Sequence, residues 1–197
     1  MSKSRGNVIY ADELAEKFTV DGVRYYALSE MPYSADGSIT YESVISRFNT
    51  DLVNNLGNLV KRTLDMQKKY FDRVVAAPVP ADTEAERALD AELAAVCAAA
   101  YDGMVANMET YHVADAVSCV FALLSRTNKY IDETAPWALA KDESRRDRLG
   151  TVLYNLLEAI RQGAVLLKPF IPATAEEILD RLHTDARGFD TVGRSFG

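Results

Sequence analysis

Apolar side chains recur every three or four positions along residues 41–71. The gaps are 3, 4, 4, 3, 4, 3 and 4, and Thr63 is the one weak member of the set, which comprises Ile45, Phe48, Leu52, Leu56, Leu59, Thr63, Met66 and Tyr70. This is helical periodicity held over many turns. It predicts a long helix that starts near Thr40 and packs one face against other helices.

Most of the remaining chain also has helical spacing. A short helix is expected from about Ala11, and Asp21 is expected to cap a second one that turns Val23, Tyr26 and Ala27 inward. The further helices predicted are these: from the capping box Thr83-x-x-Glu86 to about Met108, from about His112 to Ile131, a short element at Pro136–Ala140, from about Asp142 to Leu167, and from Ala173 to Leu182. The tail after that helix is expected to be loose.

The connections between these helices contain prolines, as in the connector with Pro78 and Pro80 and the break with Pro169 and Pro172. No alternation of strands and helices appears, and no internal repeat is evident. The predicted fold is therefore all-α, an antiparallel helix bundle preceded by a small helical connecting segment.

The charge of the chain limits what it binds. The net charge of −7 argues against a nucleic-acid module that binds by bulk charge. It leaves open a module that reads a few unstacked bases by stacking and hydrogen bonds. Cys97 and Cys119 are far apart, so no zinc knuckle is expected and a reducing cytoplasm fits. No apolar run reaches membrane-spanning length, so no membrane partner is expected.

Three groups of polar or aromatic residues are candidates for chemistry. Asn54, Asn58 and Arg62 are four apart, so they stack on one flank of the long helix, either as a solvated surface or as fixed donors for a planar ligand. The lone tryptophan, Trp137, follows Pro136 and is either a core residue or a stacking surface. Residues 1–9, MSKSRGNVI, have the lysine, hydroxyls and glycine of a phosphate-gripping loop, but their composition alone favours a disordered terminus.

Four segments carry a resemblance to a known family. MSKSRGNVI resembles the Lys-Met-Ser-Lys-Ser signature loop of class I aminoacyl-tRNA synthetases, without its first lysine. DGVRYYALSEMP at 21–32, DLVNNLGNLVKRT at 51–63 and ETAPWALAK at 133–141 resemble the methionyl branch, and the last two together point to methionine. The chain therefore resembles the C-terminal part of a methionyl-tRNA synthetase. Residues 1–38 would be the end of the catalytic module and residues 39–197 the anticodon-binding domain.

The resemblance implies a site for the CAU anticodon of tRNA(Met). Asn58 and Arg62 match an asparagine and an arginine that contact the anticodon in that family, and Pro136 and Trp137 match its stacking pair. A splayed-out base needs an aromatic face and donors at fixed positions, which these side chains provide.

The resemblance also implies catalytic positions, because Lys3, with Ser2 and Ser4 beside it, matches the lysine that stabilises ATP phosphates. ATP and Mg²⁺ would be used only by the full enzyme, together with its own catalytic domain. This chain has His112 and His183 but no His-x-x-His pair, and no nucleotide-binding sheet precedes the loop. We expect the chain alone to be inactive and to hold no metal, and a Met1 inside the motif suggests a truncated protein.

Two other interpretations remain open. The chain could be a free-standing helical protein-interaction module, in which Trp137 would be buried and distant from Asn58 and Arg62. It could also be the same region of a leucyl, isoleucyl, valyl or cysteinyl enzyme, which shares the loop motif but gives no reason for Asn58, Arg62 and Trp137 to occur together.

Overall fold

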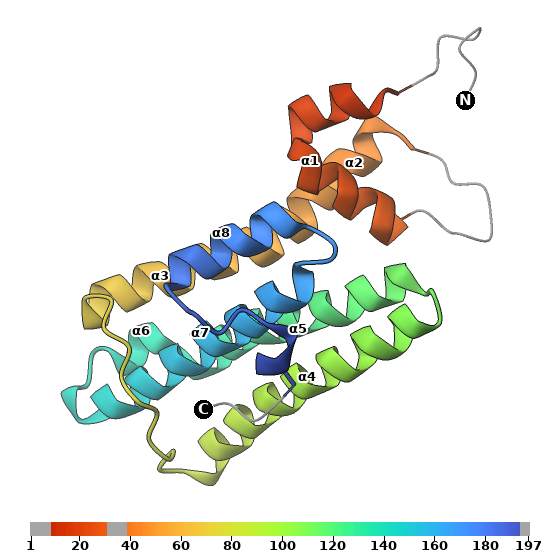
Figure 1. The fold of residues 1–197 in the computed structure, drawn as a ribbon. Coiled ribbons are helices and arrows are strands. Elements are labelled where there is room, and N and C mark those ends of the chain that lie inside the picture. The colour runs from red at the N-terminus through yellow and green to blue at the C-terminus, as the bar shows by residue number, and fades with distance from the viewer. Residues whose placement is uncertain (1–8, 31–38, 194–197) are drawn as a thin grey trace, which may run out of the picture.

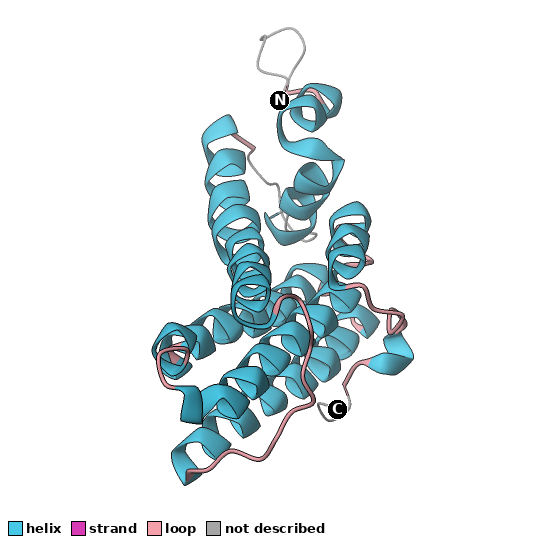
Figure 2. Cartoon of the chain, turned by 90° about the vertical axis from the view of Figure 1, so that its left-hand side faces the viewer, coloured by secondary structure: helices cyan, strands magenta, loops and turns pink. Residues whose placement is uncertain are grey.

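A computed structural model describes residues 9–30 and 39–193 of the 197-residue chain. Within these ranges every regular element is a helix, and no strand is present (Figure 2). The elements in order are α1 (Ala11–Glu30), α2 (Tyr41–Arg47), η2 (Phe48–Gly57), α3 (Asn58–Phe71), α4 (Glu84–Glu109), α5 (Val113–Thr134), α6 (Pro136–Leu139), η3 (Glu143–Arg145), α7 (Arg146–Leu167), α8 (Pro172–Leu182) and η4 (Phe189–Thr191). The all-α prediction is confirmed. None of these helices is long and apolar enough to cross a membrane.

The core of the bundle is built from α4, α5 and α7, with α3 and α8 packed onto it (Figure 1). Helix α5 runs antiparallel to both α4 and α7. The predicted inward faces are confirmed in these helices, since Leu93, Val120, Leu124, Leu156 and Ile160 are all at most 1% exposed. The capping box of Thr83 and Glu86 also forms as expected at the start of α4.

The N-terminal segment docks on the bundle through α1. Tyr25 belongs to the main core and packs on Phe121 of α5, with ring centroids 4.9 Å apart. Leu14, Tyr26 and Val44 form a separate small core between α1 and α2. Helix α1 is therefore held both by α2 and by α5.

The cap expected at Asp21 is wrong. The chain kinks at Thr19, where φ is 67°, and the Thr19 hydroxyl accepts the backbone N–H of Gly22. Asp21 is buried and instead accepts the N–H of Thr174, 2.6 Å away, near the start of α8. The Asp21 carboxylate thus accepts from a first-turn N–H of α8, which has no partner within its own helix. Ala27, expected inside, is exposed.

The long helix predicted from residue 40 to 71 exists as a rod, but its middle is π-helical from Phe48 to Gly57. A π-helix advances by more residues per turn than an α-helix, so the buried positions move relative to an α-helical pattern. Ile45 is 44% exposed and Val44 is buried, which corrects the expected inward face at this end. Leu56 and Leu59 are buried as predicted.

The chain after α8 is more ordered than expected, up to the last described residue. The guanidinium of Arg161 donates to the backbone carbonyls of Ala186 and Thr191, both at 2.8 Å, and Val192 is buried in the core. The prediction of a loose tail after the last helix is therefore wrong for residues 183–193, the part of the tail that the structure describes. Pro172, expected to break the chain, is the first residue of α8, where a proline has no intrahelical N–H to lose.

Candidate nucleic-acid interface

The predicted polar line on the long rod faces α5. Asn54 lies in η2 and Asn58 and Arg62 lie in α3, and all three are exposed. The Asn58 amide donates to the Asn54 side-chain oxygen at 3.4 Å. One turn further on, the Arg62 guanidinium lies 3.5 Å from a carboxylate oxygen of Asp132, in the last turn of α5. The line therefore borders the seam between the rod and α5.

A hydrogen-bonded cluster in that seam fixes the rod against α5. Asn128 donates to both the backbone and side-chain oxygens of Asn55, each at 2.9 Å, and Asn55 donates to the Ser125 hydroxyl at 2.9 Å. Asn55 meets Ser125 and Asn128, and Arg62, further along the rod, meets Asp132, further along α5. The rod and α5 therefore run in the same direction. The rod is thus held in register just before Asn58.

Sequence reasoning missed this cluster, although a signal was present. Ser125, Asn128 and Asp132 are spaced three and four apart, so they share one face of α5. Asn55, Asn58 and Arg62 have the same spacing on the rod, and Asn55 and Arg62 contact that face of α5.

Trp137 is presented by the short helix α6, directly after α5. Helix α5 ends at Thr134 and is capped by Ala135, which adopts a left-handed backbone conformation with φ of 43° and donates its N–H to the Ile131 carbonyl at 2.9 Å. Pro136 then starts α6 and is buried, whereas Trp137 is 44% exposed. The turn therefore places an indole ring on the surface at the end of the helix that carries Asp132.

The last turns of α5 are held in place by a buried arginine. Arg126 is 8% exposed and pairs with Glu92 of α4 and with Glu133, each at 2.9 Å. Burial acts to lower the pKa of Arg126, but the bond to Glu92 and the charge of Glu133 outweigh it, so the pKa is raised and the group stays charged. Glu133 pairs with Arg126, whereas its neighbour Asp132 pairs with Arg62.

The structure brings some of the predicted site residues together. Asn58 and Arg62 share one flank, and the ion pair with Asp132 places Arg62 at the end of α5, where α6 with Pro136 and Trp137 follows. Among the described contacts, no hydrogen bond, ion pair or cation–π interaction joins Trp137 directly to either residue. Ser2, Lys3 and Ser4 lie outside the described residues, and the described part holds no cluster of three metal-ligating side chains.

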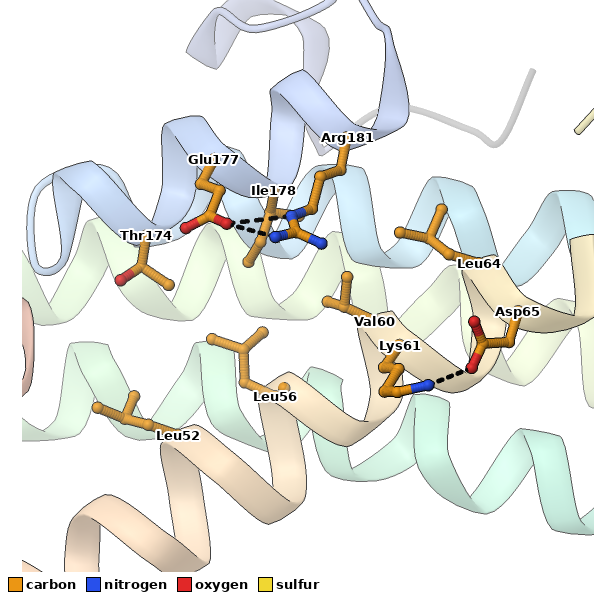
Figure 3. Close-up of a pocket in the computed structure, with 11 residues that line it drawn as sticks. Leu52, Leu56, Val60, Lys61, Leu64, Asp65, Thr174, Glu177, Ile178 and Arg181 are labelled. Atoms are coloured by element: carbon orange, nitrogen blue, oxygen red, sulfur yellow. Dashed lines mark hydrogen bonds and ion pairs between the residues drawn. The ribbon is translucent and has the colours of Figure 1, made fainter. Parts of the chain in front are cut away.

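A groove of about 410 Å³ lies on the opposite flank of the rod, between η2–α3 and α8 (Figure 3). Its walls are apolar, with Leu56 and Val60 from the rod and Ile178 from α8. Its charged side chains pair within their own helices, Lys61 with Asp65 and Arg181 with Glu177. The charged groups in this groove are therefore paired with each other, and the polar line of Asn54, Asn58 and Arg62 lies on the flank toward α5.

The flank toward α5 has the chemistry to hold unpaired bases. An exposed indole ring offers a stacking face, and an amide and a guanidinium on a rigid helix offer donors for base edges. A helical bundle that presents such groups on its surface resembles helical modules that bind nucleic acid.

Comparison with known proteins specifies the class. Residues 1–64 match the family described as "tRNA synthetases class I (M)", and residues 78–194 match the "Anticodon binding domain of methionyl tRNA ligase". The chain is 43% identical over 192 residues to the methionine–tRNA ligase of Clostridium tetani, and 44% identical over 182 residues to that of Bacillus subtilis. These alignments cover 98% and 92% of this chain but only 29% and 27% of the two relatives.

Solved structures agree with this assignment. Mycobacterium tuberculosis methionyl-tRNA synthetase bound by methionyl-adenylate matches with a TM-score of 0.91 and 36% identity, covering 100% of this chain and 39% of that one. Its apo form matches with a TM-score of 0.87 and 34% identity, covering 96% of this chain and 38% of that one. The chain belongs to the methionyl-tRNA ligase family, and residues 78–194 match its anticodon-binding domain. It spans less than a third of the length of the curated relatives it matches.

Proposed function

We propose that this chain is the anticodon-binding part of a methionine–tRNA ligase and recognises the CAU anticodon, so that the full enzyme attaches methionine to tRNA(Met). In this proposal residues 39–197 form the anticodon-binding domain, and residues 1–38 are the end of the catalytic module. The observation that carries it is the position of Trp137, which is 44% exposed at the same end of α5 as the partner of Arg62.

Each site residue has a role in the proposal. Trp137 provides the face on which an anticodon base stacks, and the buried Pro136 fixes the turn that carries it. Asn58 and Arg62 donate to base edges or to the phosphates beside them. The Arg62–Asp132 pair is solvent-exposed, with side chains 45% and 70% accessible, so exchanging it for an RNA contact costs about 1 kcal/mol or less.

In the full-length enzyme this domain would act together with its own catalytic domain, which uses ATP and Mg²⁺. Lys3, with Ser2 and Ser4, would contact the ATP phosphates as methionyl-adenylate forms. Charge stabilisation of a transferring group is the physical basis of that role.

Binding of two RNA stem-loops to the 197-residue chain tests the anticodon role. One carries CAU, and the other has the same size with one anticodon base changed. Trp137→Ala and Arg62→Ala should each weaken CAU binding by about 1–3 kcal/mol, which is roughly 5- to 150-fold, because each removes a stacking face or a set of donors. Trp137→Phe should retain much of the binding, since it keeps an aromatic face.

Matched controls separate a local effect from a general one. Phe189→Ala removes an aromatic ring of similar exposure, 40%, from the distant η4, and Arg181→Ala removes an exposed arginine from α8. Both should bind as the unchanged chain does. In the full enzyme, Trp137→Ala should lower tRNA charging and spare adenylate formation. Intact charging, or an equal loss of adenylate formation, would contradict the proposal.

The protein-interaction alternative is less well supported. It requires a buried Trp137 that is remote from the α3 flank, whereas Trp137 is half-exposed and follows the helix that Arg62 contacts. The alternative of another class I synthetase is disfavoured by the family match, which is to the methionyl branch.

A further inference from the structure

Basic side chains without a carboxylate partner gather near one end of α3. The described lysines and arginines that make no ion pair with a described carboxylate are Lys17, Arg24, Lys68, Lys69, Arg73, Lys141 and Arg146. Lys17 and Arg24 belong to α1. The other five lie in or just after the last turn of α3, or between α6 and the start of α7. Unpaired cations are thus concentrated at the end of the bundle that also carries Trp137.

Contacts between α3 and α7 hold part of this group in place. The Arg146 guanidinium lies 4.8 Å from the centre of the Phe71 ring and donates to the Tyr70 carbonyl at 3.4 Å. The Lys69 ammonium lies 5.1 Å from the centre of the Tyr70 ring. Aromatic faces therefore fix these two cations without neutralising them.

The charge of the bundle is unevenly distributed between its helices. Helix α3 carries four basic residues and one acidic residue, whereas α4 carries six acidic residues and one basic residue, in a chain of net charge −7. Both helices pack on α5 and α7, from different sides (Figure 1). A polyanion is therefore favoured on the α3 side and repelled on the α4 side.

Acidic residues also occur near the unpaired cations. Asp72, Asp142, Glu143 and Asp147 lie in the same part of the chain, but none forms an ion pair with a described cation. They weaken the long-range field. Attraction of a polyanion at this end must then come from short-range contacts with single ammonium and guanidinium groups.

We propose that Lys68, Lys69, Arg73 and Arg146, here called the cationic end of α3, bind backbone phosphates of the tRNA anticodon arm. The proposal rests on the proposed function and assigns a separate task to this surface. Trp137, Asn58 and Arg62 contact the anticodon bases and the phosphates beside them, whereas the cationic end positions the arm without contacting bases. Phosphates suit it because lysine and arginine donate charge-assisted bonds to phosphate oxygens.

The test compares two triple variants of the 197-residue chain that both lower its net charge by three. Lys68→Gln, Lys69→Gln and Arg73→Gln remove three of the four cations of the cationic end and leave Arg146, which packs on Phe71. Lys17→Gln, Arg87→Gln and Arg181→Gln remove cations from α1, α4 and α8. The affinity for the CAU stem-loop is measured at several salt concentrations. Each lost phosphate contact lowers the slope of log affinity against log salt by about 0.7–0.9.

In the first triple variant the magnitude of the slope should therefore be smaller by about 2–3. The control triple variant should keep the slope of the unchanged chain. Between 50 and 200 mM salt, the unchanged chain should lose roughly 20- to 40-fold more affinity than the first variant. The loss at low salt should be equal for CAU and changed-anticodon stem-loops. Trp137→Ala removes an uncharged ring, so it should weaken binding and leave the salt slope unchanged.

Lysines at the end of a helix also stabilise the helix dipole. A purely structural role would lower the melting temperature and leave the salt slope unchanged, and that result would overturn the inference. Equal slopes in the two triple variants would overturn it as well. Failure of the proposed function is a separate result, because it would appear as an unchanged chain that does not prefer CAU.

Discussion

A buried ion pair joins three helices of the bundle and allows a quantitative test of the packing. Arg148 of α7 is 4% exposed, and its guanidinium nitrogens lie 2.5 and 2.8 Å from the carboxylate of Asp90 of α4. Tyr130 of α5 donates to the same carboxylate at 2.6 Å and accepts from the Asn155 amide at 3.1 Å. Burial and the bond to Asp90 raise the pKa of the Tyr130 hydroxyl.

Asp90→Ala should destabilise the chain by about 3 kcal/mol. Removing one partner of a buried pair leaves an uncompensated charge, which costs about 3–5 kcal/mol. Glu86 remains 3.7 Å from the Arg148 guanidinium, which places the expected value at the lower end of that range. The measurement is urea unfolding, in which the midpoint should fall while the denaturant slope stays unchanged.

Replacing both partners shows how much of the lost stability comes from leaving one charge buried without its partner. Asp90→Leu combined with Arg148→Met removes both charges, and it should be less destabilising than Asp90→Ala because no charge remains buried. The control is Glu84→Ala, which breaks the exposed pair with Arg87 and should cost less than about 0.5 kcal/mol. If Asp90→Ala cost no more than Glu84→Ala, the reasoning about this network would be refuted.

Two further predictions concern the rod and the chemistry. Leu59→Ala and Leu56→Ala should each cost about 2–5 kcal/mol in the free energy of unfolding, because both side chains are at most 2% exposed and leave cavities. Val53→Ala, at a position 41% exposed, is the control and should be nearly neutral, whereas neutral changes at both leucines would show that the buried face is assigned wrongly. The chain alone should not catalyse methionine-dependent exchange of pyrophosphate with ATP, since its described residues contain no nucleotide-binding sheet. Exchange above a control preparation that carries an inactive protein would contradict this.

The helices were predictable because their signals are local. Apolar spacing and the capping box of Thr83 and Glu86 act within one helix, and α4, α5, α7 and α8 lie where they were expected. The errors arose where distant parts of the chain meet. Asp21 looked like a local cap, but its partner is Thr174, more than 150 positions away.

The π-helical middle of the rod was hidden for a related reason. The apolar residues of 41–71 fit an α-helical pattern well, so nothing in their spacing indicated wider turns. In the structure, η2 must meet α1 and α5 together. The rings of Phe48 and Phe18 pack 5.7 Å apart, and a Cβ placed on Gly22 would come within 2.8 Å of Phe48. Such close packing against α1 is a tertiary demand that a pattern within one helix does not contain.

The sequence proposes the residues of the candidate site but not their arrangement. Side-chain chemistry and the family resemblance identify Asn58, Arg62 and Trp137, while their separation along the chain gives no information on how they are oriented. The structure adds the face of α5 that lies between them, where Asn128 holds the rod and Asp132 holds Arg62. These residues looked like ordinary polar positions because each is informative only beside its partner on the rod.

The exposure of the Arg62–Asp132 pair gives a physical reason for how an acidic chain could bind RNA at this site. In the free chain, Asp132 keeps the guanidinium near the end of α5, which reduces the entropy lost when a ligand arrives. Because the pair is exposed, it is worth about 1 kcal/mol or less, so a base edge or phosphate can replace it at little cost. A buried pair such as Asp90–Arg148 could not be exchanged in this way, since opening it would leave a charge inside the bundle. The bundle therefore keeps its strong ion pair where α4, α5 and α7 must stay together, and a weak one where we propose that the anticodon binds.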